Sequence, residues 1–260
     1  DGLVGEQEYQ NVAEFANGDF ILHWTVEGDQ ISMAMTTDVI GYLAIGFDPD
    51  LVMRNADVVL GYVTPSGAVH VEDLFSTGTF GPLLNDTALG GTFDLLDFNG
   101  SNSEGSTIIE FRRALNTGDE FDKPIPTLGI MDIIWAFGTG EDAINEFPRV
   151  GSGSIDLGTG GSSEDLELWP FHVLTMTVGA VLLLTSVGML YVRKSVKKRY
   201  QWHKGLGTAG VALVVLGLMM AIYKVEGEHL RVDHSYAGLA TIILLLFPIV
   251  LALATSKIND

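Results

Sequence analysis

The stretch that decides the fold is Arg193-Lys-Ser-Val-Lys-Lys-Arg-Tyr-Gln-Trp-His-Lys204, which holds six Lys and Arg residues in a chain whose formal net charge is −19. Uncharged runs flank this basic loop, with residues 169–192 before it and residues 205–223 after it. A third uncharged run, 235–256, follows a short loop of mixed charge. Each run is long enough to cross about 30 Å of hydrocarbon as a helix. The sequence therefore predicts three transmembrane helices, at about 168–192, 204–224 and 234–256.

The basic loop also orients the helices. Lys and Arg are enriched in cytoplasmic loops, so we place loop 193–204 in the cytoplasm and the mixed loop 224–234 outside. Residues 1–167 are then extracellular and the C-terminus is cytoplasmic. We expect a multi-pass protein of the cell membrane. The chain begins at Asp1 rather than Met, as expected after removal of a signal peptide.

Charge divides the chain into two parts of opposite sign. Residues 1–167 hold 29 Asp/Glu and 5 Lys/Arg, a net charge of −24, whereas residues 168–260 hold 4 Asp/Glu and 9 Lys/Arg, a net charge of +5. The acidic part would repel phosphates, which argues against nucleic acid as a partner. The chain has no cysteine, which excludes disulfides, thiolate metal sites and thioether-attached haem.

The first part of the chain has the pattern of an all-β domain. Short runs rich in β-branched and aromatic residues are separated by Gly, Asn and Asp, which is typical of a sandwich. We expect strands near 20–26, 31–36, 41–47, 56–63, 68–72, 107–112 and 132–138. The sequence thus predicts an all-β sandwich over residues 1–158, a Gly/Ser/acidic linker over 159–167, and an all-α three-helix bundle over 168–260.

Histidine carries the clearest chemical signal. Four of the six histidines lie in or beside the apolar runs, where an ionisable group is costly and usually functional. His172 and His234 open the first and third helices, which run in the same direction, so both should lie near the outer face. Two imidazoles that face each other at one depth can ligate a haem iron from both sides. His203 opens the second helix on the inner face. The alternative is that these are interfacial histidines held by hydrogen bonds.

Two families resemble parts of this chain. The membrane half resembles the core of the cytochrome b561 family in the segments Trp169-Pro-Phe-His172, Gly188-Met-Leu-Tyr-Val-Arg193, Trp202-His203-Lys-Gly-Leu-Gly and Asp233-His234-Ser-Tyr. The first half resembles the DOMON family, a β-sandwich often fused to such helices outside the membrane, in the segments Gly41-Tyr-Leu-Ala-Ile-Gly-Phe-Asp, Met53-Arg-Asn-Ala-Asp57 and Ile134-Trp-Ala-Phe-Gly138.

The b561 resemblance implies electron transfer across a membrane between two b haems, each held by two histidines. By that pairing His172 and His234 hold the outer haem. The family core has four helices and four ligand histidines, whereas this chain stops after three predicted helices. The expected partner of His203 is then absent, so we expect that the inner haem is missing or that another subunit completes it.

The DOMON resemblance implies a haem b site in which a methionine at the position of Met53 pairs with a histidine or lysine. That second ligand should fall near residues 147–153, where Arg149 stands, and arginine does not normally ligate iron. His70 and His23 are the other candidates in this domain, although the alternation around each indicates a solvent-facing side chain. A haem-free domain is the alternative.

The sequence therefore predicts a membrane-anchored b-type cytochrome subunit rather than a self-contained enzyme. We expect it to carry electrons between the membrane and an extracellular redox partner, with a lipid quinone and other subunits of a membrane redox complex as further partners. The alternative is a haem-free extracellular ligand-binding or structural module anchored by three helices. Two acidic turns, Asp48-Pro-Asp50 and the Asp94/Asp97 pair, are weaker candidates for a cation, because such turns are commonly solvated loops.

Overall fold

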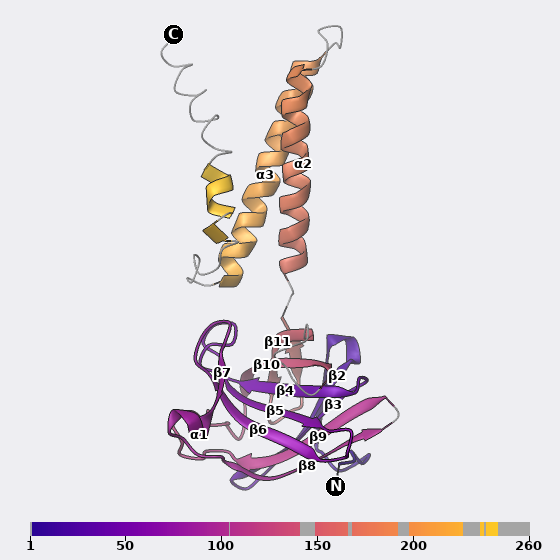
Figure 1. Cartoon of the computed structure of the whole chain (residues 1–260), viewed down its shortest axis with the longest axis vertical. Coiled ribbons are helices and arrows are strands. Elements are labelled where there is room, and N and C mark those ends of the chain that lie inside the picture. The colour runs from indigo at the N-terminus through magenta and orange to yellow at the C-terminus, as the bar shows by residue number, and fades with distance from the viewer. Residues whose placement is uncertain are drawn as a thin grey trace. The chain divides into compact units, whose positions relative to one another are not determined.

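The computed structural model divides the chain into two compact units, Asp1–Leu166 and Glu167–Asp260 (Figure 1). The structure describes residues 2–103, 105–140, 149–165, 168–191, 198–225, 235–236 and 238–243. Within these ranges every strand belongs to the first unit and both long helices belong to the second. The predicted order of an all-β domain followed by apolar helices is thus confirmed.

The first unit is a sandwich of two antiparallel sheets. The five-stranded sheet has the strand order β1-β2-β3-β9-β8, and the seven-stranded sheet has the order β12-β11-β10-β4-β5-β6-β7. The strands are β1 (Asn11–Phe15), β2 (Phe20–Glu27), β3 (Gln30–Thr37), β4 (Gly41–Phe47), β5 (Asp57–Val63), β6 (Val69–Ser76), β7 (Leu83–Asn85), β8 (Leu95–Ser103), β9 (Ser106–Ala114), β10 (Ile130–Thr139), β11 (Arg149–Asp156) and β12 (Ser162–Glu164). The short helices are η1 (Ala16–Gly18) and α1 (Asp86–Leu89). Each of the seven expected strands is present.

The core lies between the two sheets and follows the period-two pattern of the strands. In β2, Phe20, Leu22 and Trp24 are fully buried, because alternate side chains of a strand point to one face. The Phe20 ring stacks on Trp135 of β10 with 5.6 Å between ring centroids. Strand β4 is buried along its whole length, since it lies at the centre of the seven-stranded sheet and is covered on both faces.

The sandwich extends into the segment that the sequence predicts as a linker. Strand β12 pairs with β11, so ordered β structure reaches Glu164 rather than ending at the predicted boundary, residue 158. The turn between the two strands is fixed by Asp156, whose side chain accepts hydrogen bonds from the backbone N–H groups of Gly158 and Thr159. This is the local bonding by which aspartate stabilises turns.

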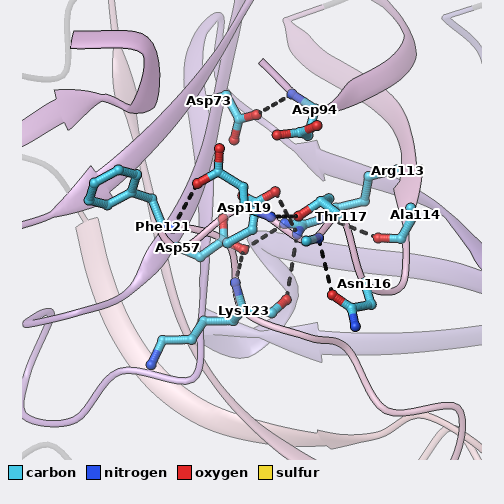
Figure 2. A network of polar contacts seen from close by, with 12 residues as sticks. Asp57, Asp73, Asp94, Arg113, Ala114, Asn116, Thr117, Asp119, Phe121 and Lys123 are labelled. Atoms are coloured by element: carbon cyan, nitrogen blue, oxygen red, sulfur yellow. Dashed lines mark hydrogen bonds and ion pairs between the residues drawn. The ribbon is translucent and has the colours of Figure 1, made fainter. Parts of the chain in front are cut away.

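A buried ion pair joins the two sheets. Arg113 of β9 places its Nη1 2.6 Å from Oδ2 of Asp57 on β5, and the two side chains are 1% and 0% exposed. The Nη2 of Arg113 lies 3.4 Å from Oδ2 of Asp122. The same Asp57 oxygen accepts a hydrogen bond from the backbone N–H of Lys123 (Figure 2). The loop that follows β9 is therefore fixed to both sheets.

The second unit contains an antiparallel pair of helices, α2 (Trp169–Tyr191) and α3 (Arg199–Val225), each long and apolar enough to cross a membrane. The two backbones approach closely where glycines meet. A Cβ atom added to Gly179 would lie 3.1 Å from the carbonyl oxygen of Gly210 and 2.9 Å from the side chain of Val214. Small residues at the contact are typical of packed membrane helices.

Helix α3 begins at Arg199, earlier than the predicted start near residue 204. The basic residues do not end the helix, because long Lys and Arg side chains can extend from a helix end toward water. Lys204 turns back over the ring of Tyr200, with 4.7 Å from its Nζ to the ring centroid. Of the predicted third helix, residues 235–236 and 238–243 are described and are helical, and the remainder lies outside the described residues.

We expect Arg113→Leu to destabilise the sandwich by about 3–5 kcal/mol, because it leaves the carboxylates of Asp57 and Asp122 buried without their cation. Arg112→Leu is the matched control. Its side chain is 48% exposed and its ion pair with Asp97 spans 3.7 Å, so its loss should change stability by about 0.5 kcal/mol or less. Urea unfolding of the full chain in detergent, followed by tryptophan fluorescence, measures both. Similar losses in the two variants would contradict the role given to the buried pair.

Candidate functional site

His172 lies in the first turns of α2 and reaches the facing helix. Its Nδ1 is 2.8 Å from the carbonyl oxygen of Gly217 on α3. Because a carbonyl oxygen can only accept, Nδ1 carries the hydrogen and the ring's lone pair is on Nε2. The approach depends on glycine, since a Cβ atom at residue 217 would lie 2.7 Å from Oγ1 of Thr175. The ring of Trp169 meets the imidazole edge-on, with 5.8 Å between centroids.

His203 has the same arrangement at the start of α3. Its Nδ1 lies 2.9 Å from the carbonyl oxygen of Ser186 and 3.0 Å from the hydroxyl Oγ of that residue. The Ser186 hydroxyl donates its own hydrogen to the carbonyl oxygen of His203, at 2.8 Å. Both oxygens of Ser186 therefore accept from Nδ1, and the lone pair of His203 is on Nε2. Ser186 is buried at the helix contact, 3% exposed.

The two histidines occupy opposite ends of the helical pair. Ser186 of α2 is bonded to His203 and so lies at the same level along the helices. It comes fourteen residues after His172, and at 1.5 Å per residue the two levels are about 21 Å apart. Metal-ligating histidines usually donate their second ring N–H to a backbone carbonyl or carboxylate, which fixes the tautomer and orients the ring. Both histidines thus have the hydrogen bonding of a ligand that binds iron through Nε2. Each end of the helical pair thus has one histidine whose hydrogen bonding fits that of a haem ligand.

His234 and His229 lie outside the described residues. The pairing of His172 with His234 across the bundle therefore stays a prediction. The same holds for the absence of a histidine partner for His203, which rests on the sequence alone.

The structure places Met53 and His70 at opposite ends of strand β5. Met53 is half-buried in the loop between β4 and β5, and its carbonyl oxygen accepts a hydrogen bond from Ala56. His70 is paired with Tyr62 near the other end of β5, where it is exposed and stacks on the tyrosine ring at 5.0 Å between centroids. Tyr62 comes five positions after Asp57, the first residue of β5. At the rise of a strand, this is a distance of about 17 Å.

Arg149 also lies away from Met53. It is the first residue of β11, pairs with Phe137, and forms an ion pair with Asp19 while its guanidinium lies 5.0 Å from the centroid of the Phe137 ring. His23 belongs to the other sheet, where it is half-buried beside Tyr9, and burial lowers its pKa. Among the described residues, Met53 is therefore brought together with neither His70 nor Arg149.

Sequence reasoning missed a cluster of buried carboxylates. Asp57, Asp73 and Asp122 each offer an oxygen, and these three oxygens lie within 4.8 Å of one another. Burial raises the pKa of Asp57 to about 6 and that of Asp73 to about 7. One signal was present in the sequence, since Asp57 opens the apolar strand Asp57-Val-Val-Leu-Gly-Tyr-Val and is itself fully buried.

A β-sandwich followed by two helices that are apolar enough to span a membrane indicates a membrane-anchored extramembrane domain. Residues 16–138 match the family model of the DOMON domain, and residues 171–258 match that of eukaryotic cytochrome b561. The chain therefore consists of a DOMON domain followed by a cytochrome b561 domain, and it is integral to a membrane.

The chain is similar to a cytochrome b561, DM13 and DOMON domain-containing protein of Arabidopsis thaliana, at 27% identity over 257 residues, 91% of this chain and 28% of that protein. It is also similar to DBH-like monooxygenase protein 1 of Homo sapiens, at 33% identity over 122 residues, 47% of this chain and 19% of that protein. The chain thus spans about a quarter and about a fifth of the length of these relatives. Among solved structures, the cytochrome domain of Myriococcum thermophilum cellobiose dehydrogenase aligns with a TM-score of 0.40 and 12% identity, over 55% of this chain and 77% of that one, which is too weak to bear on function.

A substitution at Gly179 tests the close packing of α2 against α3. We expect Gly179→Leu to destabilise the helical pair by about 1–3 kcal/mol, because the new side chain meets the backbone of Gly210. Gly188→Leu is the matched control on the same helix, since no described atom lies within 4 Å of an added Cβ there. Unfolding by SDS in mixed micelles measures the difference. Equal stability of the two variants would contradict the interface described above.

Proposed function

We propose that this chain is a membrane-anchored b-type cytochrome subunit that carries electrons between the membrane and a redox partner on the outer face. The observation that carries the proposal is the hydrogen bonding of His172 and His203, which leaves the lone pair of each ring on Nε2. The match of residues 171–258 to the cytochrome b561 family supports haem as the cofactor. Bound haem supplies the one-electron chemistry.

The helices supply ligands and their orientation. In this proposal Nε2 of His172 holds a haem b near the outer face together with His234. The carbonyl of Gly217 accepts the hydrogen of Nδ1, which keeps the His172 ring in one tautomer and one orientation. Such a hydrogen bond also raises the basicity of the ligating nitrogen. His203, held by Ser186 in the same way, would serve a second haem at the other end of the helical pair.

The direction of the chain in the membrane follows from charge. Loop 193–204 carries six Lys and Arg residues, which the positive-inside rule assigns to the cytoplasm. His203 then lies at the inner face, His172 at the outer face, and the DOMON domain outside. A lipid quinone and an extracellular redox protein are the partners that this arrangement would connect.

The DOMON domain would dock or relay to that outer partner. Met53 remains the candidate ligand for a haem there, although the described residues place His70 and Arg149 away from it. This observation favours a second function for the sandwich alone, that of a haem-free module that binds a partner or ligand. The number of haems per full chain separates a haem-binding sandwich from a haem-free one, because a haem in the sandwich adds to the number held by the helices.

Replacement of the outer ligands tests the proposal. We expect purified full chain in detergent to show a b-type reduced-minus-oxidised spectrum, and we expect His172→Ala and His234→Ala each to lose at least one haem per chain by pyridine haemochrome assay. The reason is that one imidazole cannot replace a bis-histidine pair. His70→Ala is the control in the sandwich. The proposal fails if the wild-type chain binds no haem, or if both membrane variants keep the full content.

A further inference from the structure

A second candidate site lies inside the sandwich and is formed by carboxylates rather than histidines. Asp57 and Asp73 come from the neighbouring strands β5 and β6, where Val59 pairs with Asp73. Asp122 comes from the loop after β9. Their side chains each offer an oxygen within 4.8 Å of the other two, and the residues are 0%, 3% and 7% exposed. Figure 2 shows Asp57 bonded to Arg113, and Asp73 bonded to the backbone of Asp94.

Each of the two strand carboxylates uses one oxygen for the protein and leaves the other open. Oδ2 of Asp57 accepts from Arg113 and from the backbone of Lys123, whereas Oδ1 has no hydrogen-bond partner among the described residues. Oδ2 of Asp73 accepts from the backbone N–H of Asp94 at 2.8 Å, whereas its Oδ1 likewise has none. Each of these two buried carboxylates is thus held in place through one oxygen and has a second oxygen available for a ligand.

A fourth carboxylate has no partner at either oxygen. Asp86 is 1% exposed, and neither Oδ1 nor Oδ2 has a hydrogen-bond partner among the described residues. It follows Asn85 of β7, which pairs with Leu74 of β6, so the register brings Asp86 beside Asp73. The pKa of Asp86 is raised to about 8, chiefly by burial and then by the charges of Asp73, Asp122 and Asp57. Asp86 therefore lies next to the cluster.

Among the described residues, the buried charges of this region are not balanced. Four of them are the carboxylates of Asp57, Asp73, Asp86 and Asp122, and one is the guanidinium of Arg113, which pairs with Asp57 and Asp122. The nearby Lys123 does not compensate them, because its Nζ is 3.6 Å from Asp48, whose side chain is 62% exposed. With every carboxylate ionised, three negative charges would stay uncompensated. Buried charges of this kind are normally paired or bound to a metal.

We propose that Asp57, Asp73, Asp86 and Asp122 form a buried binding site for a divalent cation, with Ca²⁺ as the preferred ion. The donors are all carboxylate oxygens, which suit a hard cation rather than zinc or copper. Magnesium usually keeps several of its waters, whereas calcium is commonly held in cages built from protein oxygens, so a buried site of carboxylates suits calcium.

Such an ion would join four elements that are distant in the sequence. Strands β5 and β6, helix α1 and the loop after β9 would share one cation, which would add to the link that Arg113 makes between the sheets. The loop that carries Met53 ends where Asp57 begins β5, so the site would also fix one end of that loop. The site depends on the sandwich alone and is independent of haem binding by the helices.

Calorimetric titration of the full chain in detergent, after treatment with EDTA, tests the proposal with CaCl₂ and MgCl₂ as the probes. We expect one Ca²⁺ per chain, weaker binding of Mg²⁺, and a higher unfolding temperature with CaCl₂. Asp73→Asn and Asp86→Asn should each weaken Ca²⁺ binding at least tenfold. Asp97→Asn is the matched control, because Asp97 has a side chain that is 74% exposed on β8 and belongs to no part of the cluster.

Protons can also neutralise these buried carboxylates, in competition with a cation. Because Asp73 and Asp86 have raised pKa values in the folded protein, the metal-free chain should gain stability as pH falls from about 8 to 6. The proposal is overturned if CaCl₂ neither produces a binding heat nor raises the unfolding temperature of the wild-type chain. It is also overturned if Asp73→Asn and Asp86→Asn bind Ca²⁺ as the wild type does. The wild-type titration decides the question even if a variant fails to fold.

Discussion

The ion pair between Arg113 and Asp57 is the constraint on which the arrangement of the sandwich depends. A charge removed from water must meet its partner at hydrogen-bond distance, so β9 of one sheet and β5 of the other can pack in one relative position only. Apolar side chains alone tolerate small shifts and repacking. The backbone of Lys123 bonds to both members of the pair, so the long loop after β9 is held by the same constraint as the sheets.

The strands that the sequence predicts are apolar runs with one or both faces buried. β2 has its core side chains at alternate positions, whereas β4 is buried along its whole length, and both patterns are visible without a structure. β8 has the sequence Leu-Leu-Asp-Phe-Asn-Gly-Ser-Asn-Ser and is mostly exposed. It lies at the edge of its sheet and forms by pairing with β9. Its strand conformation comes from the neighbour's backbone, which a local pattern does not reveal.

The candidate sites differ in the same way. His172 and His203 are visible in the sequence because a histidine at the start of a long apolar run is unusual in itself. Asp57, Asp73 and Asp122 are ordinary acidic residues until strand pairing and the loop after β9 bring them within 4.8 Å of one another. The acidic turns singled out from the sequence, Asp48-Pro-Asp50 and Asp94/Asp97, are local clusters. Burial, which gives the three distant carboxylates their chemistry, is a property of the assembled sandwich.

In the helical pair, packing and ligand chemistry have one origin. No water is available at membrane depth, so each polar group must be satisfied within the protein. Because residue 217 is glycine, α2 can approach α3 closely enough for His172 to reach the carbonyl oxygen of Gly217. That oxygen accepts a hydrogen bond only if Nδ1 of His172 carries the hydrogen. Ser186 imposes the same tautomer on His203 through its carbonyl and its hydroxyl. The small residues that bring the helices together therefore also select Nε2 as the nitrogen available to a metal.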